Sequence, residues 1–120
     1  MIFSQSLKKR QDFQNTYKKG TSKGNRYLVL YVLRKENAEN RLGISVSKKV
    51  GNSVVRHRVT RLIRESYRLN ETRFMKGIDM IFVARPSCKG IPFQEMEKSV
   101  LSLAERSKIL EAEDPCQEVL

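Results

Sequence analysis

The stretch KKVGNSVVRHRVTRLIRESYR, residues 48–68, decides how this chain folds. A Gly51-Asn52 break introduces it, and Asn52 or Ser53 can cap the helix that follows. At about 100° per residue, an apolar stripe is predicted at Val55, Val59, Leu62, Ser66 and Leu69, with Ile63 at its margin. The opposite side holds His57, Arg61, Arg64 and Arg68, flanked by Arg56 and Arg58. The pattern predicts a helix over 53–69 that packs on a core through one face and presents cations on the other.

The charge on this helix has a single sign, since its arginines face only Glu65 among acidic residues. Like charges one turn apart repel, and a face that merely keeps a helix in water normally alternates acids with bases. Guanidinium groups bind phosphates through paired hydrogen bonds that lysine cannot match. A solvated face is the simpler alternative, but the one-signed run favours a nucleic acid as partner.

The whole chain is basic, with 24 Lys and Arg against 13 Asp and Glu in 120 residues and a formal net charge of +11. Such an excess favours a polyanionic partner, because phosphate contacts release counterions. Residues 1–35 carry nine bases and one acid, residues 41–68 carry eight bases and one acid, and residues 109–120 carry four acids and no Lys or Arg. We therefore expect one binding domain over 1–110 and an acidic, disordered tail over 111–120.

Residues for independent catalysis are scarce. The basic half holds only four acids, Asp12, Glu36, Glu39 and Glu65, which are too few for a two-metal nuclease. Cys88 and Cys116 lie far apart, and the single His cannot complete a zinc site, so reduced thiols and a cytoplasmic location are expected. No apolar run approaches the length of a transmembrane helix, about 18 residues, and the N-terminus lacks a signal-peptide pattern.

The remaining periodicity predicts an α+β fold, one sheet with helices packed on it. A short helix is expected over 10–19, with Gly20 as its C′ residue and a loop over 21–26. Strands are predicted over 27–34, 41–47 and 78–85, and a last helix starts at Pro92 with the stripe Phe93, Met96, Val100, Leu103 and Ala104. The first two strands can pair as a hairpin. If 41–47 and 78–85 are parallel, the basic helix is the crossover between them.

Phe13 and Tyr17 form an aromatic pair at i,i+4 on the first of these helices. Core packing is the usual role of such a pair, and a stacking platform for unpaired bases, which Tyr31 can join, is the alternative. Seven bases surround this helix: Lys8, Lys9, Arg10, Lys18, Lys19, Lys23 and Arg26. His57 also has two interpretations, a hydrogen bond to a phosphate or base, or a neutral exposed side chain.

Three stretches together resemble one family. SVSKKVGNSVVRHRVTRLIRE (45–65) is similar to the signature of the bacterial ribonuclease P protein subunit, which is built around an Arg-Asn-Arg core. RQDFQNTYKKGTSKGNRYLVLY (10–31) resembles the first helix and following strand of that family, with its link at Gly20, Ser22, Asn25 and Arg26. IFVARP (81–86) resembles its last strand, and the likeness covers about residues 7–108.

The resemblance implies a single-domain α/β sandwich of order α-β-β-β-α-β-α, in which one short strand is not placed by the sequence, with a left-handed βαβ crossover through the basic helix. It implies an endoribonuclease subunit that is not itself the catalyst: an RNA subunit, with Mg²⁺, removes the 5′ leader of precursor tRNA. The implied partners are that RNA and precursor tRNA. No membrane, no obligate protein partner and no cofactor bound by the protein alone are expected.

Two binding sites follow from the same resemblance, within an RNA-binding domain over 1–110. The site for the catalytic RNA comprises Lys48, Lys49, Asn52, Arg56, His57, Arg58, Arg61, Arg64 and Arg68. The site for the single-stranded leader comprises Phe13, Tyr17, Lys18, Arg26, Tyr31 and Ser45. With the family in view, leader stacking is as well supported as core packing for Phe13 and Tyr17.

Three features depart from the family pattern. His57 replaces the central Asn of the Arg-Asn-Arg core and retains a hydrogen-bond donor, whereas Thr60 replaces a basic residue and removes one phosphate contact. The acidic tail contrasts with the basic ends common in the family, and we do not expect it to touch RNA. A ribosomal or RNA-chaperone protein is the alternative function. A DNA recognition helix is less favoured, because 53–69 has few Asn or Gln side chains.

Overall fold

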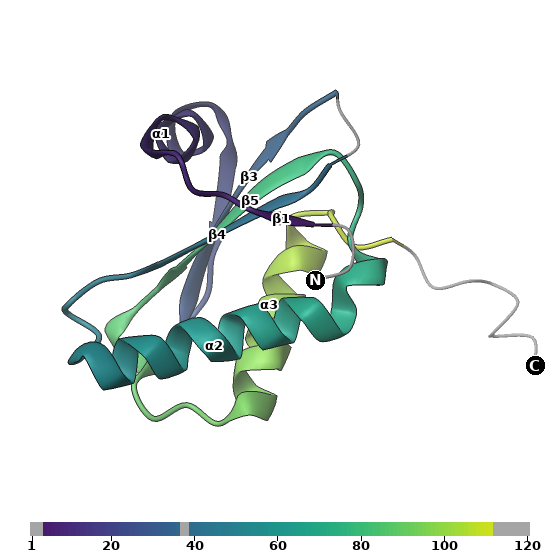
Figure 1. Cartoon of the computed structure of the whole chain (residues 1–120). Helices are drawn as coiled ribbons and strands as arrows, with labels where there is room; N and C mark the ends of the chain where they lie inside the picture. The colour runs from purple at the N-terminus through teal and green to yellow at the C-terminus, as the bar shows by residue number, and fades with distance from the viewer. Residues whose placement is uncertain (1–3, 37–38, 112–120) are drawn as a thin grey trace, which may run out of the picture.

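In the computed structural model, which describes residues 4–36 and 39–111, one five-stranded sheet lies between helices on its two faces (Figure 1). The strands are β1 (Gln5–Ser6), β2 (Thr21–Gly24), β3 (Leu28–Arg34), β4 (Arg41–Val46) and β5 (Ile78–Ala84). The helices are α1 (Arg10–Lys19), α2 (Ser53–Asn70) and α3 (Phe93–Arg106), with short 3-10 turns at Glu71–Arg73 and Pro86–Cys88. α2 and α3 cover one face and α1 crosses the other, which confirms the α+β prediction. Apart from Glu111, the tail for which we predicted disorder lies outside the described residues, as does Cys116.

The order of strands in the sheet is β1-β4-β5-β3-β2, so the predicted hairpin between β3 and β4 is wrong. β5 lies between them, antiparallel to β3 with Tyr31 opposite Ile81, and parallel to β4 with Ile44 opposite Phe82. β5 is buried along nearly its whole length. A strand with two apolar faces is most stable at the centre of a sheet, and this burial separates the two strands that are neighbours in sequence.

Of the two short strands, β2 is the one that the implied order α-β-β-β-α-β-α contains without placing it, and β1 was not predicted. The loop expected over 21–26 is wrong for Thr21–Gly24, which pairs with β3 as β2, and Gln5–Ser6 pairs with β4 as β1. Both strands are polar and exposed, so they lack the alternation of apolar residues that marks a half-buried strand. Their backbone hydrogen bonds to the sheet define them instead.

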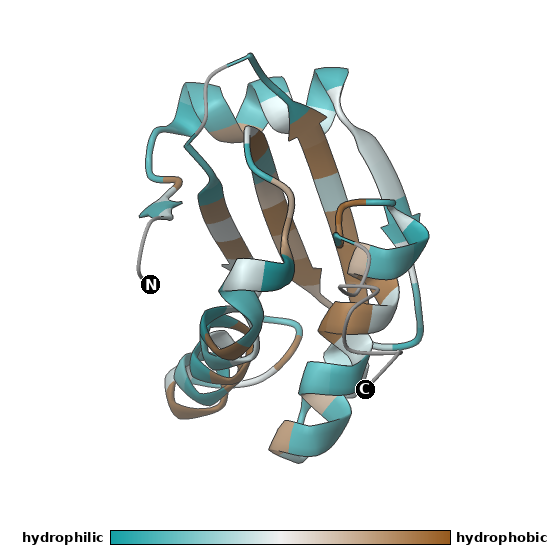
Figure 2. Ribbon diagram, turned by 90° about the vertical axis from the view of Figure 1, so that its right-hand side faces the viewer, coloured by the Kyte–Doolittle hydropathy of each residue, from teal (hydrophilic) through white to brown (hydrophobic). Residues whose placement is uncertain are grey.

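The parallel pair β4–β5 confirms that the basic helix α2 is a crossover. Figures 1 and 2 together show its hand. In Figure 2 the parallel strands β4 and β5 run downward and away from the reader. β4 lies to the left of β5, and α2 lies beneath the sheet. This arrangement is a left-handed crossover, against the usual right-handed rule, as the resemblance implied.

The main core fills the space between the sheet and the pair α2–α3 (Figure 2). α2 contributes Val59, Ile63, Ser66 and Tyr67, all of them inaccessible to solvent. The stripe predicted from the sequence is therefore rotated around the helix, because Ile63 lies within the buried face and Leu69 is 53% exposed. Tyr67 can enter the core because its hydroxyl pairs with the Ser4 hydroxyl at 2.6 Å, which leaves no orphaned polar atom.

α3 packs beside α2 with the stripe that the sequence predicts, except at its first residue. Met96, Val100, Leu103 and Ala104 are buried, whereas Phe93 is only partly buried. Ser99 is buried as well, because its hydroxyl accepts a hydrogen bond of 2.9 Å from the Asn25 side chain. The apolar start of α3 thus remains partly open to solvent next to α2.

Gly20 ends α1, but its φ is −81°, so the left-handed conformation common at C′ is not the reason for glycine here. Space is the reason. A Cβ atom would lie 2.5 Å from the Val32 carbonyl oxygen and 2.6 Å from the Thr16 carbonyl oxygen. At Gly24 the nearest atom would lie 3.7 Å away.

Gly20→Ala should therefore lower the free energy of unfolding by about 1–3 kcal/mol, because the backbones of α1 and β3 must separate to admit a methyl group. Gly24→Ala is the matched control and should cause no loss. Urea unfolding of the two variants and the parent tests the difference. Equal stability of the two variants would contradict the close backbone approach at Gly20.

Candidate nucleic-acid interface

The basic face of α2 projects away from the core. His57, Arg61 and Arg64 are exposed on the helix, and Lys48 and Lys49 are exposed in the loop before it. None of these five side chains takes part in the ion pairs found within the part of the chain that the structure describes. The two arginines and two lysines are therefore not held in ion pairs by the protein and can meet an anionic ligand, and the His57 ring is open to the same ligand.

Two residues predicted to contact RNA have structural tasks at the ends of this surface. The Asn52 side chain caps α2, since its Oδ1 accepts a hydrogen bond from the Val55 backbone N–H at 3.0 Å. Arg58 donates from its Nη2 to the Ile91 carbonyl oxygen at 2.8 Å and ties α2 to the loop before α3. Any RNA contact by Arg58 must share the guanidinium with that carbonyl.

Arg56 and Arg68 also differ from the exposed cations. Arg56 is partly buried, and its Nε has no hydrogen-bond partner among residues 4–36 and 39–111. Arg68 forms an ion pair with Glu65 one turn away, which lowers the pKa of Glu65 below its ordinary value. Thr60, the departure from the family pattern, donates its hydroxyl to the Arg56 carbonyl oxygen at 2.9 Å. The six basic side chains of α2, His57 included, are thus not equivalent.

A second surface lies on the other face of the sheet, under α1. Phe13 and Tyr17 of α1 have ring centroids 6.3 Å apart, and Tyr17 meets Tyr31 of β3 edge-on at 4.8 Å. Tyr17 also shares a side-chain hydrogen bond with Ser45 of β4. Four of the residues predicted to bind the leader therefore form one group, the aromatic cluster, made of Phe13, Tyr17, Tyr31 and Ser45.

The two aromatic residues of α1 differ in their surroundings. The Phe13 ring lies against Gly43 of β4, where a Cβ atom would come within 2.8 Å of it. Tyr17 is 38% exposed. Burial raises the pKa of the Tyr17 phenol, although its hydrogen bond with Ser45 opposes this shift. Phe13 therefore packs on the sheet, outside the main core, while Tyr17 keeps part of its ring open to solvent.

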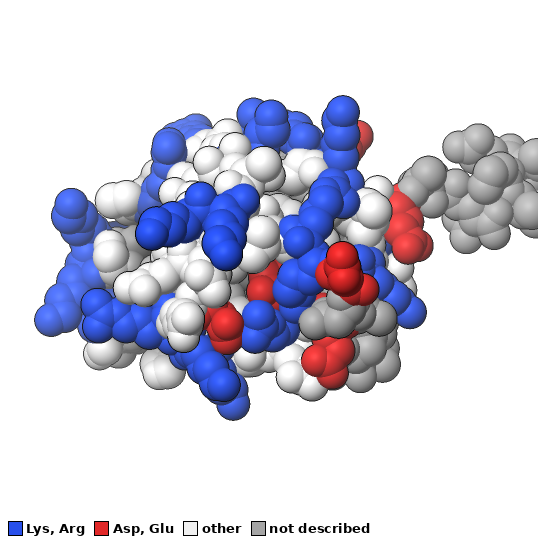
Figure 3. Space-filling view, turned by 90° about the horizontal axis from the view of Figure 1, so that it is seen from above, with Lys and Arg blue, Asp and Glu red and all other residues white. Residues whose placement is uncertain are grey.

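Lys18 borders the aromatic cluster and Arg26 does not contact it. With Gln14 and Tyr17, Lys18 lines a pocket of about 480 Å³. The Arg26 guanidinium lies 5.3 Å from the centroid of Tyr27, which packs against the main core. Figure 3 views the α1 face and shows Lys and Arg side chains spread across it, with neutral surface and some Asp and Glu side chains between them.

An ion network that the sequence analysis missed holds α1 on the sheet. Arg41, the first residue of β4, donates to both carboxylate oxygens of Asp79 at 2.9 and 2.7 Å and to Asp12 of α1 at 3.0 Å. Lys35 adds an ion pair with Asp79 at 2.7 Å. We call these four residues the Arg41 network. Its signal in the sequence is an acid, Asp79, inside an apolar strand, and its effect is to hold Phe13, the neighbour of Asp12, in place.

Asn25, part of the family link between β2 and β3, is structural. Its Oδ1 accepts hydrogen bonds from the backbone N–H groups of Tyr27 and Leu28 at 3.0 and 2.9 Å, and its Nδ2 donates to the Ser99 hydroxyl of α3. The side chain thus shapes the turn and joins it to a helix. Asn25 therefore serves the fold, whereas Ser22 and Arg26 of the same motif are exposed.

Groups suited to independent chemistry are sparse in the described ranges 4–36 and 39–111. No three His, Cys, Asp or Glu side chains there are grouped to hold a metal ion, and no helix there is long and apolar enough to cross a bilayer. Cys88 is buried, with its thiol donating to the Tyr27 carbonyl oxygen, and burial raises its pKa. A buried thiol of raised pKa is a poor nucleophile.

Asp79→Asn should lower the free energy of unfolding at neutral pH by about 1–3 kcal/mol, because Arg41 and Lys35 lose a charged partner. Burial acts to raise the pKa of Asp79, but hydrogen bonds from Arg41 and Lys35 outweigh it and hold the pKa below its ordinary value. A lowered pKa stabilises the fold above the unfolded-state pKa of about 3.9, and this stabilisation is lost as the pH falls through the folded-state pKa. Urea unfolding at decreasing pH should show variant and parent converging below about pH 4.

Glu65→Gln, which removes an exposed ion pair, is the control for this experiment. It should change the stability less than Asp79→Asn does at neutral pH, because solvent screens the pair. If the difference in free energy of unfolding between Asp79→Asn and the parent stays constant as the pH falls below about 4, the role given to the carboxylate is contradicted.

Comparison with known proteins agrees with this geometry. Residues 2–108 match the family model described as Ribonuclease P. The ribonuclease P protein component of Lachnoclostridium phytofermentans is 54% identical over 112 residues, which cover 93% of this chain and 97% of that relative. The ribonuclease P protein component of Alkaliphilus metalliredigens is 47% identical over 110 residues, covering 92% of this chain and 99% of that relative.

Solved structures show the same fold. The RNase P protein of Staphylococcus aureus superimposes with a TM-score of 0.83 at 36% identity, covering 90% of this chain and 99% of that chain. The RNase P protein of Thermotoga maritima gives a TM-score of 0.78 at 29% identity, covering 85% of this chain and 96% of that chain. Sequence, fold and family match together show that the chain belongs to the ribonuclease P protein family.

Proposed function

We propose that this chain docks on the catalytic RNA of ribonuclease P and holds the 5′ leader of precursor tRNA while that RNA, with Mg²⁺, removes the leader. The observation that carries the proposal is the separation of two surfaces. Cations free of ion pairs project from α2, and the aromatic cluster lies under α1 on the opposite face of the sheet. Two RNA molecules can therefore bind at once. The protein alone is not expected to cleave RNA, and we expect the complex to act in the cytoplasm.

Docking on the catalytic RNA would be electrostatic. Arg61 and Arg64 lie three residues apart on one helix, at the spacing of about 5–6 Å that brings their guanidinium groups close together. Such groups suit neighbouring phosphates, because each planar fork donates two parallel hydrogen bonds. Lys48 and Lys49 extend the cationic surface beyond the start of α2. Neutralising these phosphates would reduce the repulsion between the catalytic RNA and the tRNA precursor.

Leader binding would depend on stacking. Unpaired bases stack on aromatic side chains, and Tyr17 presents a partly exposed ring supported edge-on by Tyr31. Lys18 beside it supplies a cation for the leader phosphate backbone. Because mature tRNA lacks the leader, this contact would favour binding of precursor tRNA over binding of mature tRNA.

The proposal is tested by adding the chain to a bacterial ribonuclease P RNA and a precursor tRNA that carries a leader, at low Mg²⁺ concentration. The rate of 5′ cleavage should rise well above that of the RNA alone. If the rate does not change although the protein binds RNA, the proposal is overturned in favour of a ribosomal or RNA-chaperone role.

Arg61→Ala should reduce the slope of log affinity for the catalytic RNA against log salt concentration by about one, since one phosphate contact is lost. Arg68→Ala is the matched control on the same helix and should change the slope less, because Glu65 already neutralises Arg68. Binding measured over a series of salt concentrations gives both slopes. Identical slopes for the two variants would contradict a phosphate contact at Arg61.

Tyr17→Ala should weaken binding of leader-bearing precursor tRNA by about 1–3 kcal/mol, the contribution of one stacked base, and leave leaderless tRNA unaffected. Asp12→Asn should cause a smaller loss of the same kind, because it releases α1 from the Arg41 network. Leu69→Ala, at an exposed site near the end of α2 and outside both predicted binding sites, is the control. If the affinity of Tyr17→Ala grows with leader length as much as that of the parent, Tyr17 does not contact the leader.

A further inference from the structure

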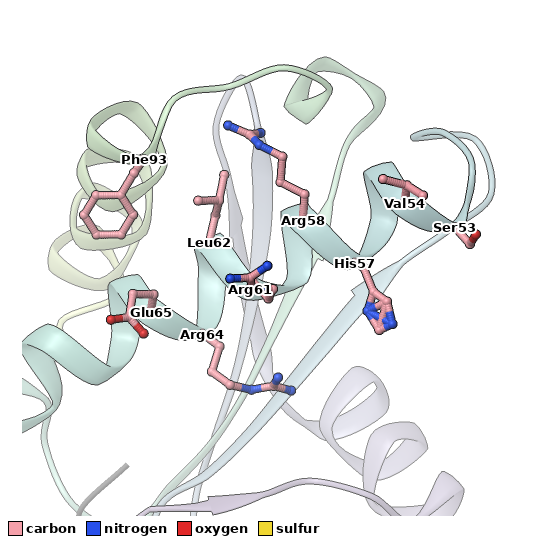
Figure 4. Close-up of a pocket in the computed structure, with 9 residues that line it drawn as sticks. All are labelled: Ser53, Val54, His57, Arg58, Arg61, Leu62, Arg64, Glu65 and Phe93. Carbon is pink, nitrogen blue, oxygen red and sulfur yellow. The ribbon is translucent and has the colours of Figure 1, made fainter.

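A groove of about 710 Å³ runs along the outer side of α2, where this helix meets the first turn of α3 (Figure 4). Val54, Leu62 and Phe93 supply its apolar part, and Phe93 comes from α3 while the others come from α2. The groove lies on the side of α2 away from the aromatic cluster, so it is separate from the leader surface. No role in folding requires an apolar Val54, which is 76% exposed.

The apolar part of the groove is continuous. Val54, Arg58 and Leu62 follow one another at i,i+4 and therefore form one stripe along α2. The hydrogen bond from Arg58 to the Ile91 carbonyl oxygen anchors the guanidinium, so that the methylene groups of Arg58 lie between Val54 and Leu62. Phe93, which is partly buried, closes the stripe from α3.

Basic side chains border this stripe on one side. His57, Arg61 and Arg64 line the same groove, and Figure 4 shows the Arg64 and Arg58 side chains leaving α2 in opposite directions. Within the described part of the chain, Arg61 and Arg64 form no ion pair with a carboxylate. The one carboxylate that lines the groove, Glu65, is ion-paired with Arg68. An apolar surface and two arginines outside any ion pair therefore stand side by side over about two helical turns.

We propose that this groove binds an unpaired nucleobase of the catalytic RNA, with the face of the base against Phe93 and Leu62 and its phosphate on Arg61. The inference rests on the proposed function and adds a specific contact to it. An unpaired nucleotide offers an apolar π face and an anion within one residue. A base inside a helix stacks on its neighbours and hides both of its faces, so a duplex would use the cations and leave the apolar stripe empty.

The size of the stripe argues against a protein partner. A stable protein–protein interface buries roughly 800 Å² on each side, with an apolar centre. Among residues 4–36 and 39–111, the large apolar side chains that are strongly exposed are few and dispersed: Val54 lies in the groove, Leu69 near the far end of α2 and Tyr17 on α1. Cations occupy most of the remaining surface of α2. One nucleobase fits this pattern of a small apolar site within a cationic face.

Val54→Glu tests the proposal without disturbing the core, because the side chain is mostly exposed. It should lower the affinity for the catalytic RNA by about 5- to 150-fold, as a stacked base and a phosphate both lose their site. Leu69→Glu adds the same charge to α2 at an exposed apolar position outside the groove and should have a much smaller effect. Equal effects of the two variants would overturn the proposal.

Phe93 gives an independent measurement. Phe93→Ala should lower the affinity within the same range and leave the salt slope unchanged, because a stacking contact carries no charge. Phe93→Tyr should restore the affinity. If Phe93→Ala does not fold, Phe93→Leu keeps an apolar side chain and removes the π face. The proposal would be overturned if Phe93→Ala changed the salt slope, or if Phe93→Leu bound the RNA as tightly as the parent does.

The base itself can be located with a photoreactive benzoylphenylalanine at position 54, cross-linked in the complex with the full RNA subunit. We expect the cross-link at a nucleotide that is unpaired in the RNA. A cross-link only within a duplex, or a cross-link to a protein of the complex, would overturn the inference. Failure of the proposed function is distinguishable, because the parent protein would then not raise the rate of 5′ cleavage.

Discussion

The burial of β5 on both faces is the constraint on which the other elements depend. Ile78, Met80 and Phe82 point into the main core, while Asp79 lies on the face that α1 covers. Since β5 pairs with β3 on one side and with β4 on the other, α2 must cross from β4 to β5 over the face it shares with α3. This path leaves the basic side of α2 in solvent. Asp79 of the same strand binds Arg41, which holds α1, so both surfaces depend on one strand.

Basic residues serve two purposes in this chain, and their partners distinguish them. Arg41 and Lys35 each form an ion pair with Asp79 at 2.7 Å, and Arg41 also forms an ion pair with Asp12. These ion pairs join α1 to the sheet. A buried carboxylate is tolerated there because it is fully paired. On α2, by contrast, Arg61 and Arg64 have no carboxylate partner among the described residues, and mutual repulsion is accepted. That repulsion is relieved when an RNA phosphate replaces solvent.

The sequence-based predictions succeeded where local pattern is sufficient. They gave the range of α1 correctly, placed the starts of α2 and α3 to within one residue, and named four residues that lie together in the aromatic cluster, whose role in leader binding stays a prediction. They failed where distant segments compete. The hairpin between β3 and β4 was wrong because β5 takes the place between them. The buried face of α2 was misplaced because Tyr67 gains a partner, Ser4, that lies 63 residues away.

The sequence by itself determined the helix over residues 53–70, the single sign of its charge and the family to which the chain is similar, since each depends on residues that are close in the chain. Only the tertiary structure decided which strand is central, which arginines are engaged by the protein itself, and that Val54, Leu62 and Phe93 share one groove. The physical reason is that propensity and periodicity act over one or two turns. Strand order and side-chain pairing are set by competition for burial among segments far apart in sequence.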